Sequence, residues 1–334
     1  MDLDYEKLEL KCGLEVHQQL DTKKLFCNCP SLLRKDEPDF QVKRKLHVVA
    51  GESGEVDVAA KYQTELKQEF LYEGYNDNTC LVELDEEPPY PINQEALKIT
   101  LQIVLLLNCT ILPITQIMRK TVVDGSNTSG FQRTVLIARD GWIETKIGRV
   151  GIASVCLEED SARTISGDSK IKVYRLDRLG IPLVEIATEA DIKSPEQAKE
   201  AALHIGEILR RCKVKRGIGT IRQDVNLSIG GGARIELKGF QDIRNIETAI
   251  EKEVARQKGL VGKNKSVAEV RKVLPSGESE FLRPLPGAAR MYPETDLPLL
   301  KISRWVTDEV RKSLPTSERE LEIEGLSKDR KSVV

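Results

Sequence analysis

The sequence predicts an α+β fold in which short strands dominate and a few helices flank them. Apolar and polar residues alternate in many short segments, the first at 14–20, and this period of two is typical of strands with one buried face. Helical spacing behind a capping residue is rarer and is clearest at 94–107 and from Pro195 onward. Hydrophobic residues make up 40% of the 334 residues, which is enough for a sizeable core.

Charge and composition exclude several classes of protein. The chain has 51 Lys and Arg against 53 Asp and Glu, a net charge of -2, so only a local basic face could bind nucleic acid. Aromatic residues are only 4%, which disfavours a stacking platform for single strands. The longest apolar run, 99–114, is short and interrupted, so we expect no membrane contact. Seven irregularly spaced cysteines behind a charged N-terminus indicate reduced thiols and a cytoplasmic protein.

The strand at 14–20 carries the first candidate site. Side chains two apart on a strand share a face, so Glu15 and His17 project together, opposite Leu14 and Val16. A carboxylate and an imidazole on one face can hold a divalent ion or orient a proton. A strand with one solvated face is the simpler interpretation, but the chain has only three histidines.

The next segments offer a weaker metal site. Cys27, Cys29 and Cys80 could donate thiolates to zinc, but zinc signatures normally contain two close pairs, so free cysteines are the simpler interpretation. Residues 41–58 and 66–85 resemble short strands broken by glycines, and the acidic run 83–87 is expected to be a solvated turn. Asn93 then caps the helix at 94–107.

A loop rich in glycine, serine and asparagine follows a strand that bears Arg119 and Lys120. Such a loop, at 124–130, offers backbone N–H groups and side-chain donors to phosphate or carbonyl oxygens. It matches neither the P-loop nor the dinucleotide fingerprint, so an ordinary hairpin loop is an equal alternative. Strands then continue on both sides of an expected turn at 140–141.

Carboxylates interrupt two apolar strands in the middle of the chain. Glu158, Glu159 and Asp160 end the first strand, and Glu185 is the single charge within the second. A lone carboxylate in an apolar run is costly unless it is paired, protonated or bound to metal. Glu185 is therefore more informative than the acidic run at 83–87.

The last third of the chain adds two polar-faced strands and several helices. Strands at 217–229 and 234–238 could form the floor of an open site or a solvated sheet face. Helices are expected after Ser194, at 245–257, in a short segment that ends at Pro275, and after Ser303. His204 lies on the first of these helices and is expected to have a structural role. The polar residues of the two strands are Arg222, Asp224, Asn226, Ser228 and Lys238. The apolar anchors of the last helix are Trp305, Val306 and Val310.

These stretches, in this order, resemble the B/E subunit family of the tRNA-dependent amidotransferases. The resemblance covers about residues 11–300, and the wording of DGSNTSGFQRT and RPLPG is that of the E type rather than the B type. The motifs are GLEVHQQLDTKKLFCNCPS, AGESGEVDVAA, YNDNTCLVELDEEPP, MRKTVVDGSNTSGFQRT, CLEEDSAR, YRLDRLGIPLVEIATEADI, KRGIGTIRQDVNLSI and RPLPGAARMYPETDLP.

The resemblance implies a fold, a reaction and partners. The family fold is a cradle of mainly antiparallel sheet with flanking helices, followed by a helical domain. The implied enzyme is a glutamine-dependent, ADP-forming ligase: ATP phosphorylates the γ-carboxylate of glutamate on tRNA(Gln), and ammonia then displaces the phosphate. The implied partners are tRNA(Gln) and the glutaminase subunit GatD, in a heterotetramer of two GatD and two GatE. No serine, cysteine or threonine lies in a convincing nucleophile context, so ammonia would come from the partner.

The resemblance also implies roles for individual residues. The Mg²⁺ ligands would be Glu15, His17, Glu158 and Glu185, with Glu159 as an alternative to Glu158 until the strand register is known. Arg119 and Lys120 would face the phosphates of ATP, and Ser126 and Asn127 would line the nucleotide or acceptor-end pocket. The floor would consist of Arg222, Asp224, Asn226 and Lys238.

Two departures from the family pattern shape the expected domains. We expect a cradle at 1–300, with the usual synthetase-like insertion absent near 262–266, and the truncated start of the helical domain at 301–334. Full selection of tRNA(Gln) by this chain alone is therefore not expected. Two alternatives stay open: a tRNA-binding scaffold with an inactive kinase site, and B-type chemistry that also accepts aspartyl-tRNA(Asn).

Overall fold

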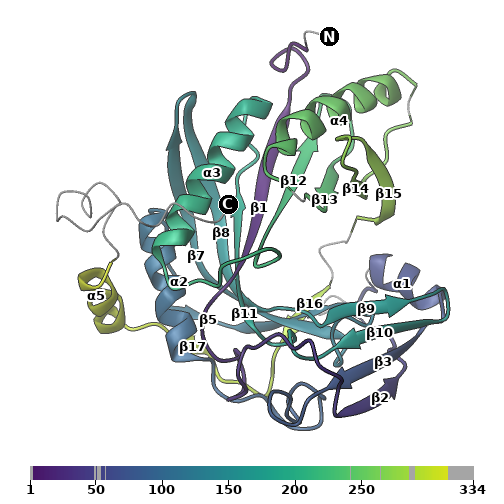
Figure 1. Ribbon diagram of the computed structural model, residues 1–334. Coiled ribbons are helices and arrows are strands. Elements are labelled where there is room, and N and C mark those ends of the chain that lie inside the picture. The colour runs from purple at the N-terminus through teal and green to yellow at the C-terminus, as the bar shows by residue number, and fades with distance from the viewer. Residues whose placement is uncertain are drawn as a thin grey trace.

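One large, strongly curved sheet organises the chain in the computed structural model (Figure 1). The structure describes residues 3–48, 50, 54–56, 58–240, 242–263, 265–285 and 290–314. Neighbouring strands of this sheet are antiparallel except β13 and β14, so the α+β prediction is confirmed. The strands in spatial order are β15 (Ser279–Pro284), β14 (Glu269–Val273), β13 (Ile235–Lys238), β12 (Ile221–Ser228), β1 (Lys11–Gln19), β11 (Pro182–Thr188), β8 (Gly148–Glu159), β7 (Phe131–Thr145), β6 (Ile117–Thr121) and β16 (Met291–Pro293), with β4 (Thr110–Ile111) beside β7.

The alternation predicted for the first strand is present in β1. Leu14 and Val16 are buried in the main core, whereas Glu15 and His17 lie on the other face and keep some exposure. Because β11 and β12 pair with β1 on its two sides, residues from three distant parts of the chain meet around Glu15 and His17.

Three helices bury the apolar face of the sheet. They are α2 (Gln94–Leu106), α3 (Pro195–Arg211) and α4 (Asn245–Val261), and Figure 1 shows α2 and α3 along one side of the central strands. The predicted caps are present: the Asn93 side chain accepts hydrogen bonds from the first turn of α2, and the Ser194 hydroxyl accepts one from the N–H of Gln197. Each cap satisfies donors that a helix start otherwise leaves unpaired.

A second, four-stranded sheet has its own small core. Its order is β2 (Phe40–Arg44), β3 (Glu69–Gly74), β10 (Ile171–Arg175) and β9 (Arg163–Gly167), and β3 and β10 run parallel. Two tyrosines of this core hold the loop after β6: the Tyr72 hydroxyl donates to the carbonyl of Gly125 at 2.7 Å and that of Tyr174 to the carbonyl of Asp124 at 2.8 Å. The second sheet therefore positions the loop at 124–130, for which the sequence left ligand binding and an ordinary hairpin as alternatives.

Three local predictions are wrong. Of the region 41–58, predicted as short strands, the described residues form one strand, β2, at its start, and helix α1 (Val58–Glu65) begins at its last residue. The short helix expected before Pro275 is strand β14, which pairs with β13 and β15. Its two buried residues, Val270 and Val273, are three apart, a spacing that fits a helix as well as a short strand.

The turn expected at 140–141 is also absent, because β7 continues through it to Thr145. Asp140 has a φ of 55°, which locally distorts the strand. A Cβ on Gly141 would lie 2.6 Å from the Leu107 carbonyl and 2.3 Å from the Cys109 sulfur. Gly141 thus allows the end of α2 to approach the strand, and the Asp-Gly pair marks close packing instead of a hairpin.

The last described residues pack back onto the main body. Strand β17 (Leu300–Lys301) pairs with β5 (Ile114–Thr115), and α5 (Arg304–Lys312) starts at the predicted Ser303 cap. Val310 is buried in the main core, but Trp305 is 73% exposed and is not the anchor that we expected. Residues 315–334 of the predicted helical domain lie outside the described residues, and the domain boundary at 300 stays a prediction.

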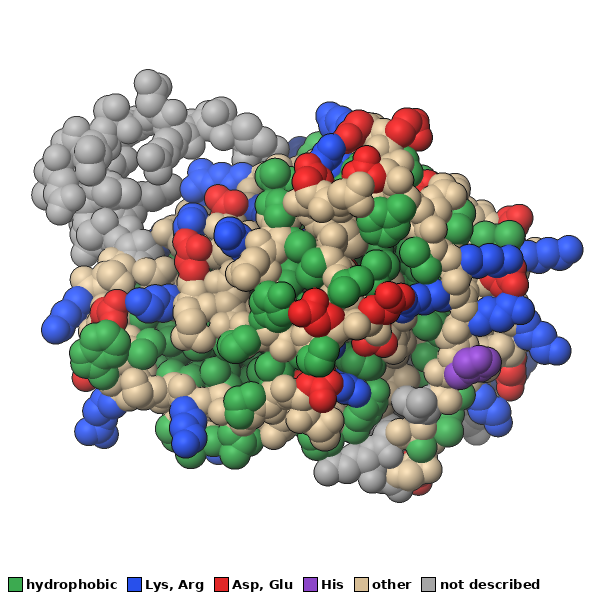
Figure 2. Space-filling view, turned by 90° about the horizontal axis from the view of Figure 1, so that it is seen from below, with side chains coloured by type: hydrophobic (Ala, Val, Ile, Leu, Met, Phe, Trp, Pro, Cys, Tyr) green, Lys and Arg blue, Asp and Glu red, His purple; other side chains and the backbone are tan. Residues whose placement is uncertain are grey.

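The molecular surface carries mixed charge. Figure 2 shows the lower face, on which cationic and acidic side chains are interspersed. Together with the net charge of -2, this leaves no single-sign field over that face. Within the described residues, no helix combines the length and apolarity that crossing a bilayer requires.

Candidate active site and a second metal-binding cluster

A cavity of about 720 Å³ lies against the polar face of the large sheet. This volume is within the range of small-molecule sites. Its walls come from β1, β6, β8, β11, β12 and β13, from the loop after β6, and from Arg283, Leu285 and Arg290 near the C-terminus. Eleven of the twelve residues that the sequence singled out as a site line it; the exception is Arg119.

His17 is the centre of the acidic side of the cavity. Its register places it opposite Glu185 of β11 and Arg222 of β12. The Nε2 atom lies 3.2 Å from Glu185 Oε2 and 3.3 Å from Glu15 Oε1. His17, Glu158 and Glu185 can bring ligand atoms within 4.8 Å of one another, and so can Glu15, His17 and Asp224.

Lys120 neutralises part of this charge from β6. Its Nζ lies 2.6 Å from Glu158 Oε1 and 3.4 Å from Glu185 Oε2. Glu158 is also held by the Thr134 hydroxyl at 2.8 Å and by the Gln132 amide at 3.0 Å. Glu158 is thereby fixed by three donors, one of them a buried cation.

Burial and mutual repulsion shift the pKa values of these groups. Burial and the charge of Glu185 raise the pKa values of both Glu15 and Glu158. Burial opposes protonation of His17, but its hydrogen bond to Glu185 and the nearby carboxylates raise its pKa overall. Burial opposes ionisation of Glu185, but Lys120 and His17 lower its pKa well below the ordinary value. Such opposed shifts in one cavity are typical of functional sites.

Strand alternation decides between Glu158 and Glu159. Glu158 faces His17 and Lys120, whereas Glu159 points to the other side, where its carboxylate contacts Arg133 at 3.4 Å. Only Glu158 of the two lines the cavity. The geometry therefore favours Glu158 in the choice that the sequence left open.

Arg119 lies outside the cavity. Its guanidinium makes hydrogen bonds of 2.7 and 3.0 Å to the buried Glu294 carboxylate and packs over the Phe131 ring at 4.5 Å. Arg119 and Lys120 are adjacent on β6, and successive side chains of a strand point to opposite faces. Both cations therefore cannot face one ligand, and Arg119 instead ties β6 to the C-terminal segment.

The four residues predicted to form the floor lie on β12 and β13. Arg222, Asp224 and Asn226 line the cavity beside Lys238, whose Nζ bridges the carboxylates of Asp224 and Glu236. Arg222 donates at 2.9 Å to Asp160, a fully buried carboxylate that also accepts from the Gln19 amide at 2.6 Å. Asp160 thus fixes the direction of the Arg222 side chain.

The loop after β6 forms another wall. Ser126 and Asn127 line the cavity, and Ser126 donates from its hydroxyl and its backbone N–H to the Asp124 carboxylate. Gly125 has a φ of 90°, and a Cβ there would lie 2.2 Å from the Phe70 ring. The loop conformation therefore depends on glycine at this position.

Sequence reasoning missed several lining residues. Glu236 shares the alternation of Arg234 and Lys238, so the period of strand β13 could have identified it. Gln132 gave no such signal, because only pairing of β7 with β6 and β8 brings it to Glu158. Arg283 and Arg290 line the cavity too, but they belong to a segment that sequence analysis used only as a motif of the family resemblance.

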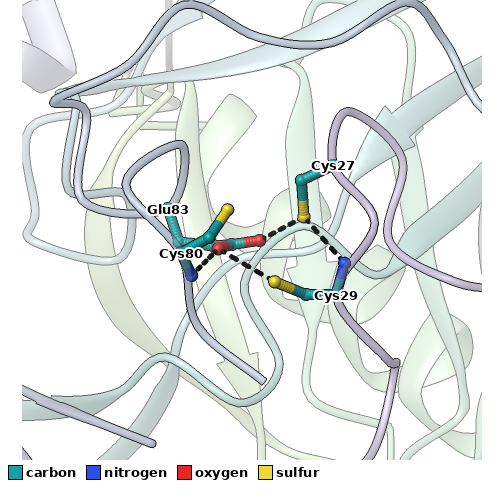
Figure 3. Close-up of side chains that lie close together, drawn as sticks. All are labelled: Cys27, Cys29, Cys80 and Glu83. Carbon is teal, nitrogen blue, oxygen red and sulfur yellow. Dashed lines mark hydrogen bonds between the residues drawn. The ribbon is translucent and has the colours of Figure 1, made fainter. Parts of the chain in front are cut away.

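A second cluster lies apart from this cavity and contains Cys27, Cys29, Cys80 and Glu83 (Figure 3). The Cys27 thiol donates to Glu83 at 2.8 Å, and the N–H of Cys80 donates to the same carboxylate at 2.7 Å. Three sulfurs and a carboxylate oxygen can lie within 4.8 Å of one another, so the four residues could hold a metal ion. Glu83 is 4% exposed, so the prediction that the acidic run is solvated is wrong at its first residue.

Lys24 completes the surroundings of this cluster. Its side chain is fully buried, and Nζ lies 3.3 Å from Glu83 Oε1 and 2.8 Å from the Asn78 carbonyl. A buried cation beside a carboxylate and three thiols offsets part of the negative charge that thiolate ligands would bring.

The acidic side of the cavity suits a divalent cation. We define the acidic cluster as Glu15, Glu158, Glu185, Asp224 and Glu236, all of which line the cavity. Among the described residues, Lys120 and Lys238 are the only lysines or arginines within ion-pair distance of these five carboxylates. A buried excess of negative charge is costly without a counter-ion, and carboxylate oxygens with one imidazole fit Mg²⁺ or Mn²⁺.

Comparison with known proteins points to one family. A family model described as the GatB/GatE catalytic domain matches residues 10–308. The chain is 59% identical over 263 residues to the E subunit of glutamyl-tRNA(Gln) amidotransferase from Methanocaldococcus jannaschii, a match that covers 78% of this chain and 42% of that protein. The corresponding protein of Methanococcus maripaludis strain C7 is 50% identical, over 90% of this chain and 47% of that protein. That of Archaeoglobus fulgidus is 53% identical, over 78% of this chain and 43% of that protein. The chain spans less than half the length of these curated relatives.

Proposed function

The chain belongs to the GatB/GatE catalytic domain family, and from this premise we propose that it carries the synthetic site of a glutamyl-tRNA(Gln) amidotransferase. In this proposal, ATP phosphorylates the γ-carboxylate of glutamate on tRNA(Gln), ADP is released, and ammonia displaces the phosphate to give glutaminyl-tRNA(Gln). The observation that carries the proposal is the acidic cluster around His17, with Lys120 beside it, in one cavity of about 720 Å³.

The side chains support phosphoryl transfer by charge and position. Glu15, His17, Glu158 and Glu185 would hold Mg²⁺, which would supply positive charge to the transferred phosphoryl group. Of these residues, His17, Glu158 and Glu185 can bring ligand atoms within 4.8 Å of one another, and Glu15 does so with His17 and Asp224. Lys120 holds Glu158 and Glu185 in place and contributes its own positive charge. Ser126 and Asn127 offer hydroxyl and amide groups to the nucleotide or to the acceptor end from the adjacent wall.

The floor residues support the amidation step. Arg222, directed by Asp160, offers a fixed guanidinium to a carboxylate or phosphate in the cavity. Asp224 and Asn226 supply acceptors on which ammonia could dock, and Lys238 links Asp224 to Glu236. Ammonia would come from a glutaminase partner, GatD, in an assembly of two copies of each chain.

The test is formation of glutaminyl-tRNA(Gln) from glutamyl-tRNA(Gln), ATP, Mg²⁺ and excess ammonium, which replaces the partner. We expect product from the unaltered chain and none from Glu15→Gln, while Glu144→Gln, on the exposed end of β7, stays active. Tight binding of charged tRNA without product would instead favour a scaffold with an inactive site. Conversion of aspartyl-tRNA(Asn) at a similar rate would favour B-type chemistry.

We also propose that the cysteine cluster holds zinc. Three thiolates with one carboxylate form an accepted tetrahedral donor set, and the buried Lys24 offsets the resulting negative charge. We expect one zinc per chain by elemental analysis, and lower zinc content and melting temperature for Cys80→Ser. Cys109→Ser changes a thiol outside the cluster and is the matched control. Zinc-free, fully stable protein would contradict this assignment.

A further inference from the structure

Three arginines of the cavity stand apart from other arginines of the chain. Arg234, Arg283 and Arg290 line the cavity, and within the described part of the chain none of them forms an ion pair. By contrast, Arg163, Arg175 and Arg222 each contact a carboxylate within 2.9 Å. A guanidinium carries five donors and stays charged, so one that faces a cavity without a carboxylate is available to an anionic ligand.

Two of these arginines are less exposed and approach the cavity from opposite edges of the large sheet. Arg283 belongs to β15, the first strand of the spatial order, and Arg290 directly precedes β16, the last (Figure 1). The acidic cluster lies on strands between these two edges. The cavity therefore has carboxylates in its middle and, among the described residues, cations without an ion pair on two sides.

The backbone fixes both arginines independently. Arg283 pairs with Val270 in the β14–β15 ladder. The Arg290 carbonyl accepts a hydrogen bond of 2.8 Å from the N–H of Thr121, and its neighbour Met291 pairs with Lys120. Because Met291 pairs with Lys120, the backbone holds Arg290 beside the end of β6 that carries Lys120.

We propose that Arg283 and Arg290 bind the phosphate chain of a nucleoside triphosphate, with Arg290 and Lys120 on the same phosphoryl group. This inference rests on the proposed function. If the acidic cluster held a divalent cation that neutralised part of a triphosphate, the planar guanidinium groups of Arg283 and Arg290 could contact its phosphate oxygens in pairs. The same chemistry could serve a phosphodiester of the tRNA acceptor end, so the test separates these two sources.

The experiment measures binding of ATP with Mg²⁺ by calorimetry for Arg283→Gln and Arg290→Gln of the 334-residue chain. We expect each change to raise the dissociation constant of ATP about tenfold to a hundredfold, as loss of a hydrogen bond to a charged group does. Binding of AMP, which lacks the phosphate chain, should change less than about threefold. Arg290→Lys keeps the positive charge but loses the paired N–H donors of the guanidinium. Its dissociation constant for ATP should therefore lie between those of Arg290→Gln and the unaltered chain.

Arg244→Gln is the matched control, because this arginine is exposed and pairs only with its neighbour Asp242 among the described residues. Unchanged melting temperatures would separate lost binding from lost folding. Weaker binding of uncharged tRNA with unchanged binding of ATP would overturn the assignment in favour of the acceptor end. Unchanged binding of both would overturn it altogether. If the unaltered chain binds no ATP, the proposed function itself is contradicted. This result differs from one in which the unaltered chain binds ATP and the arginine variants bind it equally well.

Discussion

Lys120 is the residue on which the acidic side of the cavity most depends. Its ammonium group is almost fully buried and lies within hydrogen-bonding distance of Glu158 and Glu185. Burial opposes the charge of Lys120, but the two carboxylates outweigh it and raise its pKa, so the lysine is charged at neutral pH. Removing one partner of a buried pair leaves the other charge uncompensated.

Lys120→Met should therefore destabilise the chain by about 3 kcal/mol in urea unfolding. The double variant Lys120→Met, Glu158→Gln should recover part of that loss, because it removes the uncompensated carboxylate as well. Lys146→Met, on the exposed β7–β8 hairpin, is the control and should change stability little. Equal losses for the single and double variants would contradict this account of the pair.

Glu294, which lies outside the cavity, should make the free energy of unfolding depend on pH. Burial opposes its ionisation, but hydrogen bonds from Arg119, the N–H of Asp296 and Arg133 outweigh burial and lower its pKa. A carboxyl whose pKa is lower in the folded state stabilises the fold above its unfolded pKa, about 4.3. That stabilisation is lost as pH falls through the folded pKa.

Glu294→Gln should therefore lower the free energy of unfolding by a constant amount between about pH 7 and 5. The difference from the unaltered chain should shrink as pH falls below about 4. Urea midpoints at about pH 7, 5 and 3.5 measure this. A difference that stayed constant or grew on acidification would show that the ion pairs with Arg119 and Arg133 do not lower that pKa.

Among the elements, those with a clear period were predictable from the sequence. Strand β1 and helices α2 and α3 follow from alternation, caps and apolar stripes, and their buried faces agree with the structure. Elements set by tertiary contact were not: β14 is too short to show its period, and Gly141 serves close packing with α2. Local patterns cannot report such long-range contacts.

The loop after β6 shows how one element depends on another. Gly125 has a positive φ and lies against the Phe70 ring of the second sheet, while the Tyr72 hydroxyl holds its carbonyl. A side chain at this position would strain the backbone and displace the ring. The loop would then carry Ser126 and Asn127 away from the cavity.

Gly125→Ala should cost about 2–4 kcal/mol of stability and raise the Michaelis constant for ATP. Gly219→Ala is the matched control, since Gly219 has a φ of 84° but no described atom within 4 Å of its Cβ position. It measures backbone strain alone, and should cost only about 1 kcal/mol. Thermal unfolding and initial rates check both variants; equal effects would exclude a role for the Phe70 contact.

At the scale of the whole molecule, the cavity is assembled from both ends of the chain. Glu15 and His17 come from the first strand and Glu158 and Glu185 from the middle of the chain. Arg290 directly precedes β16, the last strand of the large sheet in the chain. Strand alternation indicated that Glu15 and His17 share a face, but sheet order alone brings the middle strands beside them. The candidate metal site was accessible to sequence reasoning through residue type and resemblance, not through its geometry.

The whole-molecule arrangement also explains why Arg119 was misplaced by sequence reasoning. Its neighbour Lys120 faces the cavity, so strand alternation places Arg119 on the opposite face of β6. There its guanidinium donates to the carboxylate of Glu294 in the C-terminal segment. Because Arg119 and Lys120 are adjacent, the sequence suggested that both bind one phosphate site. In the fold, Lys120 lines the cavity and Arg119 holds the C-terminal segment through Glu294. Strict application of the strand period would have separated them.

The central claim is that the acidic cluster supports phosphorylation of glutamyl-tRNA(Gln), and its partial reaction tests this most directly. We would measure ADP formation from ATP and Mg²⁺ without any ammonia, in the presence and absence of glutamyl-tRNA(Gln). The account predicts ADP formation that requires the charged tRNA, is lost in Glu185→Gln and persists in Glu144→Gln. ADP formation that ignores the charged tRNA, or that survives Glu185→Gln, would contradict it.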